Sequence, residues 1–376
     1  MIPPAGDERR PPDVPRTPAG IRPPMPGPGT SIFPHRARPA MTRTFRVFSL
    51  LAATCALAPA LAAQAVVDAA RANQEQIARL DRARTVVLLV GSILEEHGPH
   101  FPVYSDGVRN EAMADSVTRV VLARGWSVLR FPVIPLGAHP FNMVAGRDVF
   151  RGSFPIRPET ERAVFMDLAD ALGGQGFRHV LVLHGHGAPD HNLVLDQAGD
   201  YFRDSYGGWM VNLIGRVGCQ PDLGQGPPPD SLLPPAAAAE NSNSPHADAL
   251  EGSRVLFLRP DLVDPAHVND RSIPATPAEW RTVGARPDWP GYIGAPRLAT
   301  RALGRWEWAR HSAACMALAS RLLDGVDERT IPRYADQMLA IPPVAADNAL
   351  MRARDAERAA AQARWLAARE RRAPQR

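Results

Sequence analysis

Cysteine is scarce in this chain, with three residues among 376. None of them stands in a CxxC spacing, which excludes the cysteine-based zinc sites that this spacing marks. Cys55 falls in a segment that we expect to be removed, so Cys219 and Cys315 remain. Two cysteines permit one disulfide in an oxidising compartment but do not require it.

A strong excess of charge is also missing from the central part of the chain. The formal net charge is +4, but residues 1–62 carry eight arginines against three acids, and residues 341–376 carry eight arginines against four acids. Residues 63–340 therefore sum to −5. Because binding of nucleic acid needs a basic face, this composition excludes a nucleic-acid-binding core.

Long apolar runs are lacking too, and the run near the N-terminus is short and rich in alanine. Residues 1–40 hold 12 of the 39 prolines without an apolar period, so we expect them to be disordered. From Met41, arginines precede the apolar run and a group of small residues, which predicts a signal peptide over 41–63. We expect translation to start at Met41 and the mature protein to be periplasmic or secreted, without a stable membrane anchor. The alternative is that the segment stays uncleaved as an anchor.

The rest of the chain alternates strand-like and helix-like segments. Apolar, β-branched runs over 85–91, 179–183 and 209–215 are typical of buried parallel strands, and the prolines of 127–135 suggest an edge strand. Helical spacing of apolar residues covers 66–80, 108–124, 158–172, 192–203, 246–258, 300–326 and 348–372. This alternation predicts an α/β fold whose mainly parallel sheet is covered by helices on both faces.

Acidic and imidazole side chains follow the first of these strands. Glu95 and His97 are two residues apart, so in extended backbone their side chains leave on the same side, and two prolines stiffen the return to Asp106. In open α/β sheets this strand end is where ligands bind. Two carboxylates and an imidazole without a basic partner suit a divalent cation such as zinc, manganese or iron. The alternative is a polar loop with solvated acids.

Two later segments carry further histidines and acids. His184-Gly-His186-Gly directly follows the strand at 179–183. Residues 218–245 are rich in proline, glycine and alanine, which predicts a long loop. We interpret this loop as a lid over the site. It leads directly to His246, at the start of a predicted helix that contains Glu251. Four other histidines are expected to support the ligands or face solvent rather than bind metal: His100, His139, His184 and His191.

Four segments, in this order, resemble the motifs of the creatininase (creatinine amidohydrolase) family. They are Gly91–Pro102, His184–Gly187, His246–Ser253 and Gly291–Thr300, with Gly304 beyond the last. The resemblance covers about 85–323 and implies a three-layer α/β/α sandwich with a binuclear metal centre at the carboxyl edge of the sheet. It implies one hydrolase domain over 64–340, which leaves 341–376 as an alanine- and arginine-rich helical tail with no expected function.

The resemblance also implies a ligand set. Glu95 and His186 would hold one metal ion, His97 would hold the other, and Asp106 would bridge the two. In creatininase a glutamate two residues after the second-motif histidine completes the second ion's ligands, but this chain has Ala188 there.

In relatives with glycine at the Ala188 position, the glutamate of the third motif takes that role, which points to Glu251. The alternative for Glu251 is a core glutamate that orients His246. His246 itself matches the family's proposed general acid/base. Asp248, Gly252 and His184 depart from the family pattern, and the tryptophans that close over creatinine have no secure counterpart, although Trp209 lies in the intervening region.

The function implied is that of a metal-dependent amidohydrolase, which cleaves a C–N bond of a small non-peptide or cyclic amide. Two divalent ions (Zn, Mn or Fe) would activate the attacking water, and His246 would supply a proton. One alternative is a creatininase-like peptidase that trims a short modified peptide. Another is a metal-loaded binding protein without turnover, suggested by Ala188 and Pro189. A hexamer is implied by the resemblance alone.

Overall fold

The computed structural model describes residues 64–219, 227–242 and 246–370. The predicted disordered segment at 1–40 and the predicted signal peptide at 41–63 lie outside these ranges. The described chain has a five-stranded parallel sheet in the order β1-β3-β2-β4-β5. Its strands are β1 (Val66–Asp68), β2 (Thr85–Val90), β3 (Ser127–Arg130), β4 (His179–Leu183) and β5 (Trp209–Asn212). In these same ranges, no helix has both the length and the apolar character needed to cross a membrane.

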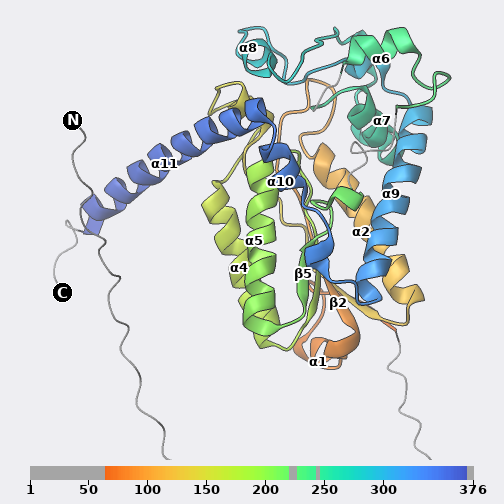
Figure 1. Ribbon diagram of the computed structural model, residues 1–376, viewed down its shortest axis with the longest axis vertical. Coiled ribbons are helices and arrows are strands. Elements are labelled where there is room, and N and C mark those ends of the chain that lie inside the picture. Colours follow the sequence, from red (N-terminus) through yellow and green to blue (C-terminus); the bar gives the residue numbers. More distant parts are fainter. Residues whose placement is uncertain (1–63, 220–226, 243–245, 371–376) are drawn as a thin grey trace, which may run out of the picture. The chain divides into compact units, whose positions relative to one another are not determined.

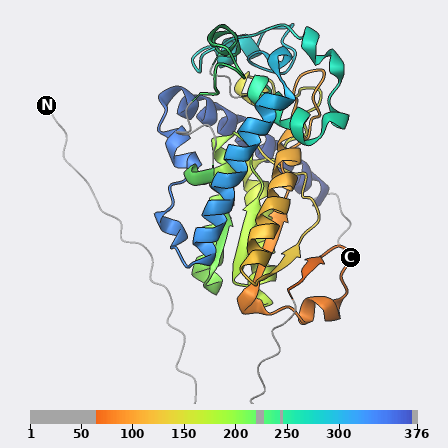
Figure 2. The same cartoon turned by 90° about the vertical axis from the view of Figure 1, so that its right-hand side faces the viewer.

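Helices cover both faces of the sheet (Figures 1 and 2). Because side chains alternate along a strand, Val86, Leu88 and Val90 of β2 pack on one face and Val87 and Leu89 on the other. The first face is covered by α2 (Ser105–Ala123) and α9 (Arg301–Leu323), the second by α4 (Pro158–Gly174) and α5 (Pro189–Tyr206). The predicted three-layer α/β/α fold is confirmed.

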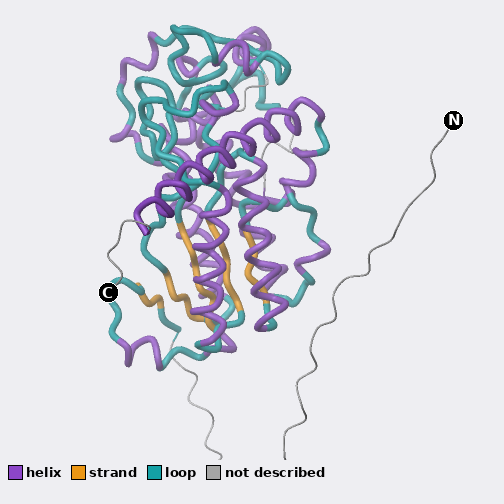
Figure 3. The backbone as a smooth tube through the Cα atoms, turned by 90° about the vertical axis from the view of Figure 1, so that its left-hand side faces the viewer, coloured by secondary structure: helices purple, strands orange, loops and turns teal. Residues whose placement is uncertain are grey.

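The order of the strands sets where a ligand can bind. From β2 the chain moves to β3 on one side, and from β4 it moves to β5 on the other. The two central strands end together, since Val90 pairs with Leu183. Loops after β2 and β4 therefore lead to helices on opposite faces, which makes this carboxyl edge the topological switch point where open α/β sheets bind ligands. Many of the longer loops gather beyond this end of the strands (Figure 3).

Two sequence predictions near the N-terminus are wrong. Residues 66–80 form β1 and the short helix α1 (Gln74–Ala78) rather than one helix. Val66 and Val67 pair with β3, and this long-range pairing overrides the helical spacing. The second error concerns residues 127–135, which were expected to form an edge strand. The strand β3 instead lies inside the sheet, and β1 forms the edge. The prolines of this segment follow the end of β3 at Arg130.

The remaining elements build the region beyond the carboxyl edge and the C-terminal tail. The helices are α3 (Phe141–Val144), α6 (Pro235–Asn241), α7 (Ala249–Leu258), α8 (Trp280–Gly284), α10 (Tyr334–Leu339) and α11 (Pro342–Glu370). Short 3-10 turns lie at Arg82–Arg84, Val217–Cys219, Pro260–Leu262, Pro265–Asn269, Pro296–Leu298 and Glu328–Thr330. Helix α6 falls inside the stretch 218–245, which was expected to be a structureless loop.

The two remaining cysteines form a disulfide. Cys219, in the turn after β5, pairs with Cys315 of α9, 96 residues later in the sequence. Both are fully buried in the core on the α2 and α9 face. The disulfide thus ties the end of the sheet region to the long helix that covers it.

Candidate metal centre

The loops after β2 and β4 are fastened to each other at the switch point. The side-chain amide of Asn110, on α2, donates to the carbonyls of Gly91 (2.8 Å) and Gly185 (2.9 Å). The Ser92 hydroxyl donates to the same Gly185 carbonyl at 3.0 Å. A Cβ at Gly91 would lie 2.1 Å from the Ile134 carbonyl oxygen, so only glycine fits where the chains approach this closely.

The five predicted metal ligands lie together at this edge. His186 Nδ1 is 3.0 Å from Glu95 Oε2 and 3.0 Å from Asp106 Oδ2, which makes one group of three. His97, Asp106 and Glu251 make a second group, with His97 Nε2 3.5 Å from Glu251 Oε2. Within each group the ligand atoms lie within 4.8 Å of one another. Asp106, in the first turn of α2, belongs to both groups.

The two histidines are oriented by backbone carbonyls. His97 Nδ1 lies 3.1 Å from the carbonyl oxygen of Glu95, and His186 Nε2 lies 3.1 Å from that of His139. A carbonyl only accepts, so each of these ring nitrogens carries the proton and the other nitrogen faces the carboxylates. His97 Nε2 is buried without a hydrogen bond. Metal-binding histidines share this arrangement: one ring N–H is donated to a neighbour, and the other nitrogen points to the metal site.

The electrostatics of the cluster also fit a cation. The expectation that the acids of the cluster lack a basic partner is wrong for Asp106, because the buried Arg109 lies 3.3 Å away. Burial opposes ionisation of Asp106, but Arg109 and His186 hold its pKa well below the ordinary value. Burial likewise opposes ionisation of Glu251, but His97 lowers its pKa to about 2. In turn, despite its burial, the carboxylates raise the pKa of His97 to about 10, Glu251 foremost. Protons on imidazoles therefore supply the positive charge that a divalent ion would bring, and the donor set suits such an ion.

His246 lies beside the cluster, just before α7. Its ring stacks on Phe141 (centroids 5.0 Å apart, planes 6° apart), and its Nδ1 is 3.7 Å from Glu95 Oε1. Burial, with help from His97, lowers its pKa. His246 also forms a third group of potential ligands with Glu95 and His97. Geometry alone thus allows either a ligand or a proton-transfer role.

The structure adds residues that sequence reasoning did not single out. Glu96 is buried 3.8 Å from His246 Nε2, and burial together with the Glu95 charge raises the pKa of Glu96 to about 8. Asn241 binds both sides of the turn into α7: its amide donates to Asp248 Oδ2 (2.8 Å), and its oxygen accepts from the Ala249 N–H (2.9 Å). The spacing of the motifs predicted neither the position of Glu96 beside His246 nor the hydrogen bonds of Asn241.

Asp248 stands where the resemblance implied a glycine, and it has a structural explanation. Its side chain caps α7 by accepting from the Glu251 N–H at 2.8 Å. Glu251 Oε2 in turn accepts from the Ala247 N–H at 2.7 Å. Together these bonds fix the first turn of α7, which carries Glu251 to His97.

The four other histidines lie outside the two groups that share Asp106. His184 and His191 are fully buried with Glu161 in a separate group behind the cluster. His100 Nδ1 contacts Asp270 at 2.8 Å, and His139 Nε2 contacts Asp355 at 2.7 Å. Their side chains thus contact neighbouring acids, while the His139 carbonyl and the His191 ring contact the predicted ligand His186.

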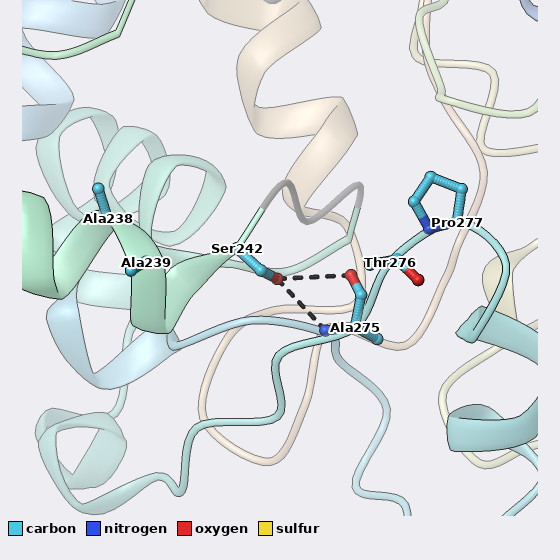
Figure 4. A pocket seen from close by; sticks show the side chains of 6 residues that line it. All are labelled: Ala238, Ala239, Ser242, Ala275, Thr276 and Pro277. Carbon is cyan, nitrogen blue, oxygen red and sulfur yellow. Dashed lines mark hydrogen bonds between the residues drawn. The ribbon is translucent and has the colours of Figure 1, made fainter.

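Aromatic residues beside His246 come from a different region than the one the sequence suggested. Trp209 begins β5 and packs on His179 at the opposite end of the strands from the cluster. Phe141 instead contacts Trp280 (5.9 Å) and Trp289 (6.0 Å between ring centroids). A separate cavity has a volume of about 340 Å³. Figure 4 shows the side chains that line it, none of them charged: Ala238, Ala239, Ser242, Ala275, Thr276 and Pro277. These described lining residues include no acid, histidine or cysteine, so they offer no group for binding a metal or moving a proton.

The fold and the cluster define a class: a parallel α/β/α protein with a buried carboxylate–imidazole cluster of metal-binding type at its switch point. Residues 70–319, more than half of the chain, match the family model Creatininase, described as creatinine amidohydrolase. The chain therefore belongs to the creatininase family, which confirms the resemblance of its motifs.

Solved structures agree on the fold. A creatinine amidohydrolase (creatininase) crystal structure is 18% identical, with a TM-score of 0.50, 68% of this chain covered and 97% of that one. A creatininase structure named for manganese and a tryptophan-to-alanine mutant creatininase are each 18% identical, with a TM-score of 0.51, 68% of this chain covered and 98% of theirs. No curated protein matches the chain. At this identity the likeness establishes the fold, and the substrate has to be argued from the site.

Proposed function

We propose that this protein is a metal-dependent amidohydrolase that cleaves a C–N bond of a small non-peptide or cyclic amide at a centre of two divalent ions. One observation carries the proposal: Asp106 belongs to two ligand groups, each completed by one histidine and one glutamate. A carboxylate shared between two such groups is the arrangement expected of a bridging ligand in a two-metal site.

The ligands divide evenly between the two ions. Glu95, His186 and Asp106 would hold one ion, and His97, Glu251 and Asp106 the other. Ala188 cannot coordinate, and Glu251 lies beside His97, which supports its role as the replacement ligand. Nitrogen and carboxylate oxygen donors suit zinc, manganese or iron. The similar creatininase structure that is named for manganese is consistent with this choice.

The chemistry follows from the groups around the cluster. When bound, a pair of divalent ions lowers the pKa of a shared water and polarises the amide carbonyl. Burial lowers the pKa of His246, which favours its neutral ring, so it can accept a proton from the attacking water and pass it to the leaving nitrogen. Its stacking on Phe141 fixes the plane of the ring. Such a transfer contributes about 10²- to 10⁴-fold to the rate.

The neighbourhood of His246 supports a compact substrate. Phe141 with Trp280 and Trp289 forms an aromatic cluster on that side of the site. Phe141 and Trp289 are almost fully buried, so Trp280, which is partly exposed, is the member of this cluster that can meet a flat, weakly polar ring. A cyclic amide offers such a ring together with a carbonyl for the cluster.

We also propose that the protein is exported to an oxidising compartment. The buried Cys219–Cys315 disulfide supports this, because such bonds persist in periplasmic and secreted proteins and are rare in the cytosol. Sequencing the N-terminus of the mature protein tests the proposal. A terminus shortly after residue 63 is expected, and a terminus that retains 41–63 would contradict cleavage.

The function is tested by stripping the purified protein of metal, reloading it with manganese or zinc, and assaying creatinine, other cyclic ureides and short blocked peptides. We expect turnover of a cyclic amide only after reloading, with the isosteric variant Asp106→Asn inactive. Turnover of peptides alone would overturn the proposed substrate class. Full metal loading without turnover of any amide would indicate a binding protein.

A further inference from the structure

Helix α11 lies beyond the family match, which ends at residue 319, and its first half packs against the hydrolase fold. Its inward residues recur at helical spacing: Val344, Asn348, Met351 and Asp355 are all buried. Asp355 is the last of them, since none of residues 356–369 is buried. Beyond it the helix extends away from the layers (Figure 1). A carboxylate that is 2% exposed at the end of a packed face requires a partner in the fold.

Asp355 has two partners: Arg358 of the same helix, which donates to its Oδ1 at 3.0 Å, and, from the hydrolase fold, His139. Asp355 Oδ2 lies 2.7 Å from His139 Nε2. The other ring nitrogen of His139 is 3.6 Å from Asp190, and Arg352 of α11 donates to that aspartate at 2.7 Å. Helix α11 therefore holds the imidazole directly through Asp355. Asp190, which Arg352 fixes, lies close to His139 Nδ1 without a hydrogen bond to it.

The backbone of His139 is strained. Its φ is +59°, in the left-handed region that residues other than glycine rarely adopt. Pro140 follows, which further restricts the conformations open to His139. Such a conformation is unfavourable and persists only where the surroundings impose it. The side chain of His139 is fixed by Asp355 of α11, a contact that constrains this backbone.

This strained residue touches the candidate metal centre. Its carbonyl oxygen accepts the hydrogen bond from His186 Nε2 at 3.1 Å. Two residues later, the Phe141 N–H donates to Glu95 Oε1 at 2.5 Å. Residues 139–141 thus orient two of the predicted ligands of one ion.

We propose that Asp355 is a positioning residue for the metal centre. It holds His139 in the left-handed conformation that aims its carbonyl at His186, which keeps His186 Nδ1 directed at Glu95 and Asp106. This inference rests on the proposed function, because it assigns His186 to a metal. It gives the C-terminal helix, predicted to be a functionless tail, a role in metal binding.

The test compares metal affinity and metal-free stability in full-length variants. Asp355→Ala is expected to weaken manganese or zinc binding about 10- to 100-fold, as loss of a supporting partner does elsewhere. The matched control is Glu357→Ala, which removes the same charge from an exposed position of the same helix. The control is expected to bind metal as the wild type does. Affinity is measured by chelator competition and stability by urea unfolding in EDTA.

A second substitution separates positioning from general support. Glycine adopts positive φ without strain, so adding His139→Gly to Asp355→Ala restores the carbonyl and with it most of the metal affinity. Adding His139→Ala instead leaves the affinity low. If Asp355→Ala does not fold, the same pair of His139 variants is compared in the isosteric Asp355→Asn chain.

The outcomes distinguish this inference from the proposed function. Wild-type protein that binds no metal at these residues overturns both. Wild-type protein that binds metal, with equal binding by Asp355→Ala, overturns the positioning role alone. Equal affinity of the glycine and alanine variants at 139 likewise overturns it, because the backbone conformation would then be irrelevant.

Discussion

The contact between helices α7 and α9 offers a demanding test, because Glu251 depends on it. Gly304 of α9 lies against Ser253 and Phe257 of α7, the helix that carries Glu251. A Cβ added at Gly304 would lie 1.9 Å from the Ser253 carbonyl oxygen and 2.9 Å from Phe257 Cβ. The first obstacle is backbone and cannot rotate away. Ordinary contact therefore requires the helices to separate by about 1.5 Å.

We expect Gly304→Ala to lower the free energy of unfolding by about 1–3 kcal/mol, the usual cost of overpacking. The melting temperature would fall by about 2–4 °C for each kcal/mol in a domain of this size. Because α7 would move with respect to His97, binding of the ion assigned to His97 and Glu251 should weaken. Binding of the ion assigned to Glu95 and His186 should weaken less. Urea unfolding in EDTA and metal titration measure the two effects separately.

The control is Gly174→Ala, at the last residue of α4, where an added Cβ meets no atom within 4 Å. This change should leave metal binding intact and raise stability slightly, since alanine favours a helix over glycine by about 0.5–1 kcal/mol. Gly304→Ala protein that is as stable as Gly174→Ala protein, with both ions bound at wild-type affinity, would refute the reasoning about this contact.

Three further predictions concern catalysis, pH and metal removal. His246→Gln should lower kcat about 10²- to 10⁴-fold while both metal ions stay bound; loss of an ion would make His246 a ligand instead. Burial, which outweighs the nearby Arg216, raises the pKa of Asp196 to about 6, above the ordinary 3.8. Protonated Asp196 therefore favours the folded state. This contribution to the free energy of unfolding is fully present below about pH 4 and is lost as the pH rises through 6, by about 3 kcal/mol in total. Urea unfolding at pH 5 and 8 should show wild type losing stability relative to Asp196→Asn, and a relative gain would contradict the assigned shift. Chelation should lower the melting temperature, because free metal at 100 times its Kd stabilises by about 2.7 kcal/mol; an unchanged melting curve would exclude metal binding by the native state.

The sequence predicted the centre of this molecule well because the relevant patterns are local. Strands β2 and β4 are continuous apolar runs, and parallel strands end at a common edge. The acids and histidines that follow them had to meet there, and the structure brings Glu95, His97 and His186 together. Their binding of metal remains a prediction.

The errors and omissions come from contacts between distant parts of the chain. Strand β1 forms because Val66 pairs with Val128, which no local pattern reveals. The contact of His139 with Asp355 spans 216 residues, and the composition of the tail suggested only a solvated helix. The left-handed backbone of His139 was also invisible, because nothing in the residue type announces it.

The two-ion centre is tested most directly by counting metal. Purified protein loaded with manganese or zinc and freed of excess metal should contain two equivalents per chain by elemental mass spectrometry, and Glu251→Gln should contain one. A single equivalent in the wild type that survives unchanged in Glu251→Gln would contradict the shared role of Asp106 and the ligand role of Glu251.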